Sequence, residues 1–275
     1  MKKFFKIMGI ITGALFVCGS FFLIIGVLSG GLNHTYKNNK WFDIVINPTV
    51  EKLEYSRLDD FDSMRLDIST ANINIKRGEE FAVEYALYGN IKCEVENDIL
   101  VIEENNNFRY IELSFKMEET YINIYIPENA VIDIEEINAD MGNINISDCC
   151  FGEINIEADM GNVEIKNVSV SDFNISAGMG NIEFDGEITG SIQVESDMGN
   201  VLFDGNFACD ANIDSDMGNV EIKNIYDMQM FDCAIDIDLG KQKINQNKGE
   251  IIENKKFDWS IDCDTGDVEL TFGKK

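Results

Sequence analysis

The sequence predicts an all-β fold: a parallel β-solenoid (β-helix) of 19-residue coils with an N-terminal β cap, preceded by one transmembrane helix. Methionine recurs every 19 residues, at Met141, Met160, Met179, Met198 and Met217, and each is followed by Gly-Asn. A fixed period near 20 residues indicates repeats that stack on one another. Between the methionines, apolar and polar residues alternate, which is typical of strands. A separate apolar run near the N-terminus predicts the helix.

Residues 1–30 are predicted to form a cytoplasmic N-terminus and a transmembrane helix. An uncharged run extends from Ile7 to Leu28 and follows Lys2, Lys3 and Lys6, and about 20 apolar residues are enough to cross a bilayer. The positive-inside rule places these lysines in the cytoplasm and the rest of the chain outside the cell. A cleaved signal peptide is the alternative, but the apolar run is longer than such peptides usually carry.

Residues 31–56 are expected to be a polar juxtamembrane linker, and residues 57–130 the first coil with a capping β region. The stretch from Ser69 to Ile75 resembles a degenerate corner followed by a strand. Further strand candidates run from Phe81 to Ile126 without a fixed period. Solenoids need atypical units at their ends, because the last coil would otherwise expose its core and its strand edge.

Residues 131–275 are predicted to be the regular solenoid with a C-terminal cap. In one repeat, Val163 and Ile165 would point inward and Glu164 outward. Parallel coils about 4.8 Å apart would place like residues above like. Later corners at Gly240 and Gly266 are expected to add a sixth and a seventh coil in chain order. The final residues, Thr271 to Lys275, would then close the end of the array.

The corner residues are expected to form a structural ladder. Glycine suits a backbone conformation that a Cβ would obstruct, and stacked asparagine amides would bond from coil to coil. The ladder comprises Gly142, Asn143, Gly161, Asn162, Gly180, Asn181, Gly199, Asn200, Gly218 and Asn219.

Two interpretations compete for the five methionines, which are the candidate interaction surface. Their thioethers could turn inward and fill a groove at the bend, since methionine adapts to irregular cores. They could instead point outward and form an apolar ridge beside the recurring aspartates. A turn separates Ala158 from Val163, so the alternation of the strands does not decide between the two. The inward orientation is favoured, because long exposed apolar stripes are uncommon on soluble surfaces.

Composition argues against several function classes. The net charge is −28, so nucleic acid is not expected as a partner, because phosphate binding needs a basic surface. The chain has 1 histidine, which lies in the linker, and Arg57, Arg65, Arg77 and Arg109 lie outside the repeats. No catalytic residues and no cofactor are therefore expected.

Metal and disulfide chemistry are also disfavoured. Asp140, Asp159, Asp197 and Asp216 recur at one corner, where calcium could relieve their repulsion. Aspartate also forms turns through its own backbone contacts, and this interpretation is favoured, so no metal is expected. The cysteines outside the membrane segment show no disulfide spacing, and free thiols are expected.

The corner repeats and the segment before them resemble those of a known family. A strand-rich lead-in ends at Ile126-Pro127-Glu128, and small-Asp-x-Gly-Asn-Ile/Val corners follow repeatedly. This pattern is similar to the bacterial "putative adhesin" family of unknown function, which is related to the toast-rack domains of envelope-stress proteins. The resemblance covers about residues 57–275 and implies a β-helix-like fold on the outer face of a bacterial membrane. It supplies no catalytic residues.

The function expected from these features is that of a non-catalytic, membrane-anchored extracytoplasmic scaffold with an adhesin-like role. Its partner would be a protein or glycan of the cell surface or envelope, or a second copy of the domain. The alternative is an accessory sensor of envelope stress linked to a two-component system, which the resemblance implies for some relatives. A polysaccharide-acting β-helix enzyme is a third, disfavoured interpretation.

Overall fold

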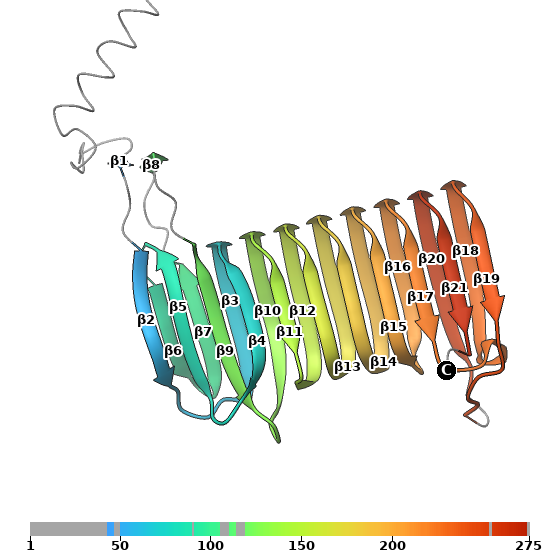
Figure 1. Ribbon diagram of the computed structural model, residues 1–275, viewed down its shortest axis with the longest axis horizontal. Helices are drawn as coiled ribbons and strands as arrows, with labels where there is room; N and C mark the ends of the chain where they lie inside the picture. Colours follow the sequence, from blue (N-terminus) through green and yellow to red (C-terminus); the bar gives the residue numbers. More distant parts are fainter. Residues whose placement is uncertain are drawn as a thin grey trace, which may run out of the picture. The chain divides into compact units, whose positions relative to one another are not determined.

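The computed structural model describes residues 43–46, 50–89, 91–104, 110–113, 119–252 and 255–273 (Figure 1). The predicted membrane segment, residues 1–30, lies outside these residues, as does the linker up to residue 42. None of the helices in the described residues has the length and hydropathy to span a bilayer. The chain divides into two units. In the first, β1 (Asp43–Ile46) pairs in parallel with β8 (Tyr110–Leu113).

The second unit is built on one sheet of 19 strands, most of them paired in parallel, which confirms the all-β prediction. Each coil has a strand that runs into the corner and a strand that leaves it. We call the two resulting surfaces the entry face and the exit face. The entry face contains β3 (Ser63–Thr70), β10 (Val131–Met141), β12 (Cys150–Met160), β16 (Asp210–Met217), β18 (Phe231–Leu239) and β20 (Phe257–Thr265). The exit face contains β4 (Asn72–Gly78), β11 (Ile144–Ser147), β15 (Val201–Phe207), β17 (Val220–Asn224), β19 (Gln242–Gln246) and β21 (Val268–Phe272).

Two long strands, β13 (Val163–Met179) and β14 (Ile182–Met198), run from one corner to the next and so belong to both faces. Their register follows the predicted period, with Met160 opposite Met179 and Met179 opposite Met198. Ile165 is fully buried and Glu164 faces outward, as the alternation predicts. The interior is therefore a set of continuous apolar columns, in which Phe184 and Phe203 stack with ring centroids 5.5 Å apart.

The coil order at the C-terminal end differs from the predicted one. β16 pairs with β20, and β20 pairs with β18, so the last strands of the chain lie between the fifth repeat and β18 (Figure 1). The exit face follows the same order, from β17 to β21 to β19. The expectation that Thr271 and Phe272 close the end was wrong, because Phe272 is fully buried inside the array. Spacing along the chain predicted the corner at Gly240 as the sixth coil, but the strands of the later corner at Gly266 occupy that place.

At the other end, β3 and β4 form the first coil in the chain and stack directly on β10 and β11, as predicted. The strands β7 (Ile99–Glu104) and β9 (Tyr121–Pro127) continue the array in parallel. Antiparallel strands then cover the end: β2 (Val50–Arg57), β5 (Ala82–Tyr88) and β6 (Ile91–Glu96). Strand structure was expected to start at Arg57, but in the second unit it begins earlier, at Val50. A short 3-10 turn, η2 (Met228–Met230), precedes β18.

Candidate functional site

The corners are held by glycine and asparagine for separate reasons. Gly161 has φ of +148°, and a Cβ added to it would lie 1.9 Å from the Gly142 carbonyl oxygen. The backbone N–H of Asn162 donates to Oδ1 of Asn143 at 2.9 Å, and each later asparagine repeats this bond. The ladder starts at Asn72, and Asp267 continues it as far as Lys241 in the last coil. Both residue types are therefore explained by the backbone.

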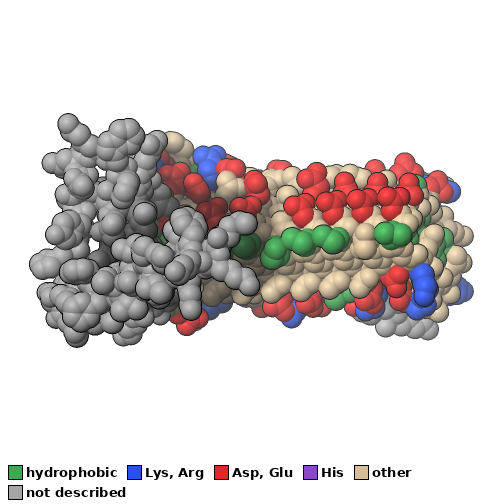
Figure 2. All heavy atoms as spheres, turned by 90° about the horizontal axis from the view of Figure 1, so that it is seen from above, with side chains coloured by type: hydrophobic (Ala, Val, Ile, Leu, Met, Phe, Trp, Pro, Cys, Tyr) green, Lys and Arg blue, Asp and Glu red, His purple; other side chains and the backbone are tan. Residues whose placement is uncertain are grey.

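The methionines of the corner point outward, and the expectation that they turn inward was wrong. Their exposed fractions are 48% for Met141, 44% for Met160, 49% for Met179, 38% for Met198 and 52% for Met217. The glycine that follows each methionine brings adjacent coils into backbone contact, so the bend has no groove for a thioether. The five side chains stack in register and form a surface that we call the methionine ridge. Figure 2 shows it as a row of hydrophobic side chains.

The methionine ridge has defined ends. Thr70 lies opposite Met141 on one side, and Thr265 lies opposite Met217 on the other. The same position in the last coil is Leu239, which is 70% exposed. Methionine is thus confined to the five regular repeats, although threonine occupies the same position in neighbouring coils.

One flank of the methionine ridge is acidic. The residue before each methionine is Asp140, Asp159, Asp197 or Asp216, and only Gly178 interrupts this column. Figure 2 shows the row of acidic side chains beside the ridge. Burial is the main cause that raises the pKa of Asp140, and the negative charge of the neighbouring Asp159 raises it further. Within the described ranges, no group of three or more His, Cys, Asp or Glu side chains has the arrangement of a metal site.

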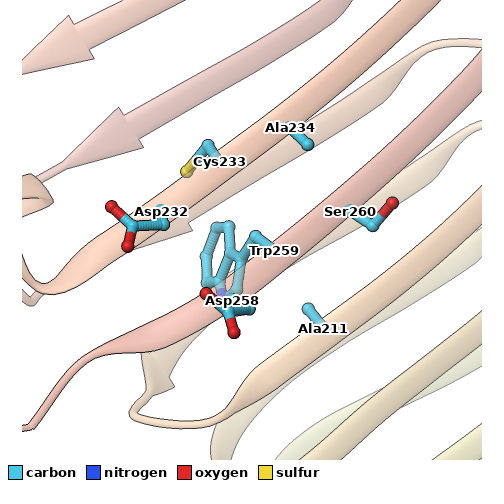
Figure 3. Close-up of a pocket in the computed structure, with 7 residues that line it drawn as sticks. All are labelled: Ala211, Asp232, Cys233, Ala234, Asp258, Trp259 and Ser260. Atoms are coloured by element: carbon cyan, nitrogen blue, oxygen red, sulfur yellow. The ribbon is translucent and has the colours of Figure 1, made fainter.

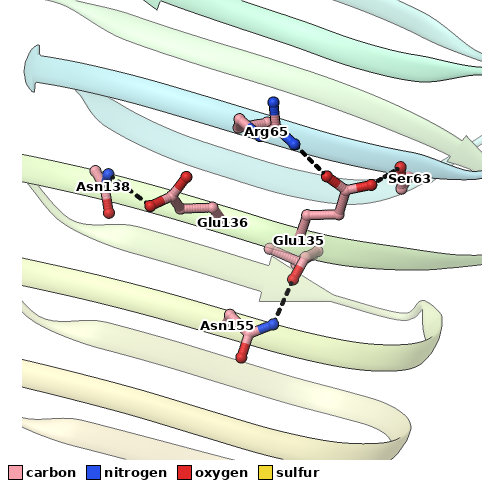
Figure 4. A network of polar contacts seen from close by, with 7 residues as sticks. Ser63, Arg65, Glu135, Glu136, Asn138 and Asn155 are labelled. Carbon is pink, nitrogen blue, oxygen red and sulfur yellow. Dashed lines mark hydrogen bonds and ion pairs between the residues drawn. The ribbon is translucent and has the colours of Figure 1, made fainter. Parts of the chain in front are cut away.

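A second polar cluster, which sequence reasoning missed, lies where β10 bulges against β3 (Figure 4). Glu135 is the extra residue of the bulge, and its carboxylate accepts hydrogen bonds from Ser63 Oγ at 2.7 Å and Arg65 at 2.6 Å. The Ser63 hydrogen bond is the main cause that lowers the pKa of Glu135, and Arg65 adds to it against partial burial. The paired carboxylate therefore stays ionised and is not poised to donate a proton. The sequence signal for the bulge is the pair Glu135-Glu136, which interrupts the alternation between Ile134 and Ile137.

A shallow hollow of about 470 Å³ lies on the entry face near the last coils (Figure 3). It is lined by Asp232, Cys233 and Ala234 of β18, Asp258, Trp259 and Ser260 of β20, and Ala211 of β16. Trp259 is 1% exposed, and its indole N–H donates to the Cys209 carbonyl oxygen at 3.0 Å. The hollow thus has two acidic side chains at its margin, and the indole of Trp259 is buried beneath it. This hollow could not be predicted from the sequence, because β18 and β20 come together only through the altered coil order.

The six cysteines that the structure describes are free thiols, as expected. Cys149, Cys209 and Cys263 are buried, and Cys150 is exposed. Burial raises the pKa of Cys149 and of Cys209 to about 12. The thiolate is the reactive form of cysteine, so these two buried side chains are chemically inert near neutral pH.

Comparison with known proteins gives one family and several structural relatives. The model of the family Toastrack DUF4097 matches residues 61–275. A crystal structure described as a putative adhesin from Bacteroides fragilis has a TM-score of 0.55 at 14% identity, over 81% of this chain and 98% of that one. A putative cell adhesion protein from Clostridium sporogenes has a TM-score of 0.38 at 13% identity, over 82% and 100% of the two chains. A putative lipid binding protein from Parabacteroides distasonis has a TM-score of 0.43 at 14% identity, over 81% and 97%. No curated protein matches the chain significantly.

Proposed function

The chain belongs to the Toastrack DUF4097 family, and on that premise we propose that it is a non-catalytic, membrane-anchored scaffold outside the cytoplasm that binds partners along the methionine ridge. The single observation that carries this proposal is the exposure of the five methionines, between 38% and 52%. Contiguous exposed apolar surface on a soluble domain commonly marks an interaction site. The Bacteroides fragilis structure with the same type of fold is described as a putative adhesin, which agrees with a binding role.

The pattern of variation among the five repeats supports a role for the methionine side chain. The positions that follow Met-Gly-Asn differ among most of the repeats, although Val163–Asn167 and Val220–Asn224 are identical, so the repeats have partly diverged. Glycine is kept by close backbone contact and asparagine by its ladder of hydrogen bonds. Neither reason applies to methionine, whose position accepts threonine at Thr70 and Thr265. A partner that contacts the side chain from outside would account for its retention.

The chemistry of the methionine ridge indicates what a partner must offer. Unbranched, polarisable methionine side chains adapt to apolar partners of varied shape. The aspartate column on one flank favours a partner with positive or hydrogen-bond-donating groups beside its apolar part. We therefore infer an envelope or cell-surface protein or glycan, or a second copy of the domain. Nucleic acid is not proposed as a partner, because the chain has a net charge of −28 and would repel phosphates.

Ridge variants displayed on cells test the proposal. Replacing Met160, Met179 and Met198 together by threonine removes the apolar surface with a residue that neighbouring coils already accept. Glu164→Thr with Glu183→Thr, on the outer side of the exit face, is the matched control. We expect producing cells to adhere to one another or to host-cell layers several-fold more than a deletion strain. The ridge variant should fall to the deletion level, while the control should not.

Two outcomes would overturn the proposal. Equal adherence of the ridge variant and the unchanged protein would show that the methionines carry no binding. If deletion leaves adherence unchanged but alters the transcription of envelope-stress genes, the accessory-sensor alternative would replace the scaffold role.

A further inference from the structure

β18 is the open end of the entry face. Among the strands that the structure describes, β18 pairs only with β20, and its other edge carries no strand. The opposite end of the same array is covered differently, because β6 pairs antiparallel with β7, and β5 and β2 follow β9 in antiparallel order. The array thus accepts antiparallel strands as covers, and one end lacks them.

The interior side of β18 is incompletely covered. Ile235 and Ile237 are only half-buried, whereas Ile261 and Cys263, which lie opposite them on β20, are 1% and 0% exposed. Cys233 is likewise half-buried, although the Trp259 beside it is buried. A further strand against β18 would bring this column to the burial found elsewhere in the array.

The edge strand of the exit face, β19, differs from β18 in its inward side chains. Gln242 lies opposite Val268 and Gln246 opposite Phe272, so polar side chains occupy two positions that are apolar in the next coil. Polar residues at inward positions are a common way to close a sheet edge. β18 has no such substitution at Cys233, Ile235 or Ile237. Of the two edge strands that the structure describes, β19 keeps one half-buried apolar residue at an inward position, Ile244, whereas β18 has three.

The outer side of β18 determines which strand could pair with it. Asp232, Asp236 and Asp238 are exposed on this side, and Asp258, Asp262 and Asp264 repeat the same positions on β20. Within the described part of the chain, Lys256 forms an ion pair with Asp232 of this group at 3.3 Å. One coil further in, burial and the nearby Asp262 raise the pKa of Asp214, which reflects the density of negative charge.

This charge pattern disfavours a second copy of the chain. An antiparallel pair of β18 strands would set aspartate columns side by side, and like charges across a strand pair are destabilising. A strand with lysine or arginine at the same spacing would meet opposite charges at each outward position. Its alternate, inward side chains would cover Ile235 and Ile237.

We propose that β18 is a docking edge for an extended segment of another protein in which basic and apolar residues alternate. The segment adds one strand to the entry face by β-augmentation. Main-chain hydrogen bonds to the free edge, burial of the half-exposed isoleucines and pairing with the aspartates each contribute to binding. The hollow beside Trp259 gives room for a larger side chain at one end of the segment (Figure 3). This site does not rest on the methionine ridge.

A labelled synthetic peptide tests the proposal with the full chain in detergent micelles. The probe has nine residues of alternating lysine and valine with blocked ends, and its binding is measured by fluorescence anisotropy. Two matched peptides serve as controls: one with glutamate for lysine, and one with alternate backbone amides methylated. We expect the lysine peptide to bind at least about tenfold more tightly than either, since tenfold is about 1.4 kcal/mol.

A charge-reversed protein separates this edge from the general acidity of the chain. Asp236→Lys with Asp238→Lys changes exposed side chains at the edge, and Asp185→Lys with Glu187→Lys makes the same change in net charge elsewhere. Binding should weaken about tenfold or more in the first variant and by much less in the second. Hydrogen exchange should slow in residues 231–239 when the peptide binds.

The outcomes that overturn the proposal are distinct. Equal weakening by both variants would indicate attraction to the whole acidic surface. Slowed exchange elsewhere in the array, with none at residues 231–239, would place binding away from β18. If the chain alone forms dimers by sedimentation that protect residues 231–239, the occupant is a second copy.

Discussion

Among the methionines that the structure describes, two groups differ clearly in exposure, and Met228 is half-buried between them. The five of the methionine ridge are between 38% and 52% exposed, while Met64 and Met230 are 0% and 2% exposed. Mild peroxide should therefore oxidise the ridge methionines together in the folded protein, and should spare Met64 and Met230 until unfolding. Peptide mass spectrometry at successive times measures this order. Oxidation of Met64 at the rate of Met160 would contradict the exposed ridge.

Two buried hydroxyls give a second prediction at this scale. Ser196 and Ser215 lie inward in the column that holds Ala158 and Ala177, and within the described residues their Oγ atoms have no hydrogen-bond partner. Ser215→Ala should raise the free energy of unfolding by about 1 kcal/mol, because a buried unsatisfied hydroxyl is removed. Urea denaturation measures the change. The exposed Ser176→Ala is the control and should stay within about 0.5 kcal/mol. A loss of stability in Ser215→Ala would mean that the hydroxyl is satisfied.

The orientation of single residues was predictable only inside a strand. Alternation placed Ile165 and Glu164 correctly, because each residue step along a strand reverses the side. Alternation could not decide the side of Met160, because the corner interrupts it. The direction of this side chain depends on how closely Gly161 brings two coils together. Repeats that vary elsewhere while keeping methionine were the sequence signal that pointed to an exposed role.

Within one strand, the two sides of β13 should respond differently to charge. Ile165→Asp places an uncompensated charge among buried side chains and should cost more than about 4 kcal/mol. Glu164→Lys acts on a partly exposed side chain that is ion-paired with Lys166 and stacked near Glu183, so a change within about 1 kcal/mol is expected. Thermal unfolding of both variants measures the contrast. Equal shifts in Tm would mean that the assigned sides are wrong.

The bulge of β10 predicts a dependence on pH. The folded state lowers the pKa of Glu135, so this group adds stability above the ordinary glutamate pKa of about 4.3, and that stability is lost as pH falls through the folded pKa. Glu135→Gln should cost less than about 1 kcal/mol at pH 7, because the side chain is 34% exposed. Urea titrations at pH 7 and below pH 4 should show the variant losing less stability on acidification. Parallel losses in both proteins would remove Glu135 as a cause.

The order of coils shows where prediction from period alone stops. Sequence spacing favours Gly240 as the next corner after Gly218, but in the structure Gly266 stacks on Gly218, and Gly240 stacks on Gly266. A usable signal was present in Gln242 and Gln246, which stand where Val268 and Phe272 stand in the other coil. Polar residues at inward positions identify an end unit. The break in alternation at Glu135 and Glu136 was a signal for the bulge, but it did not identify Ser63 and Arg65 as the partners of Glu135.

For the whole molecule, the proposed topology places residues 31–275 outside the cell. Lysines before the apolar run motivate this orientation. Protease added to intact spheroplasts should cleave the domain, and a cytoplasmic marker protein should remain whole as the control. Full protection of the domain, with cleavage only after lysis, would reverse the orientation. The anchor itself remains a prediction from residues 1–30.

The interleaved coils at the C-terminal end have a consequence for the time at which this protein can fold. A chain that emerges from the ribosome can add coils one after another as far as β17, because each new coil finds the previous one already in place. β18 and β19 are synthesised next, but the strands with which they pair in the folded array, β20 and β21, follow them in the chain. The last two coils must therefore wait and assemble together, so the final residues of the chain control whether either one forms.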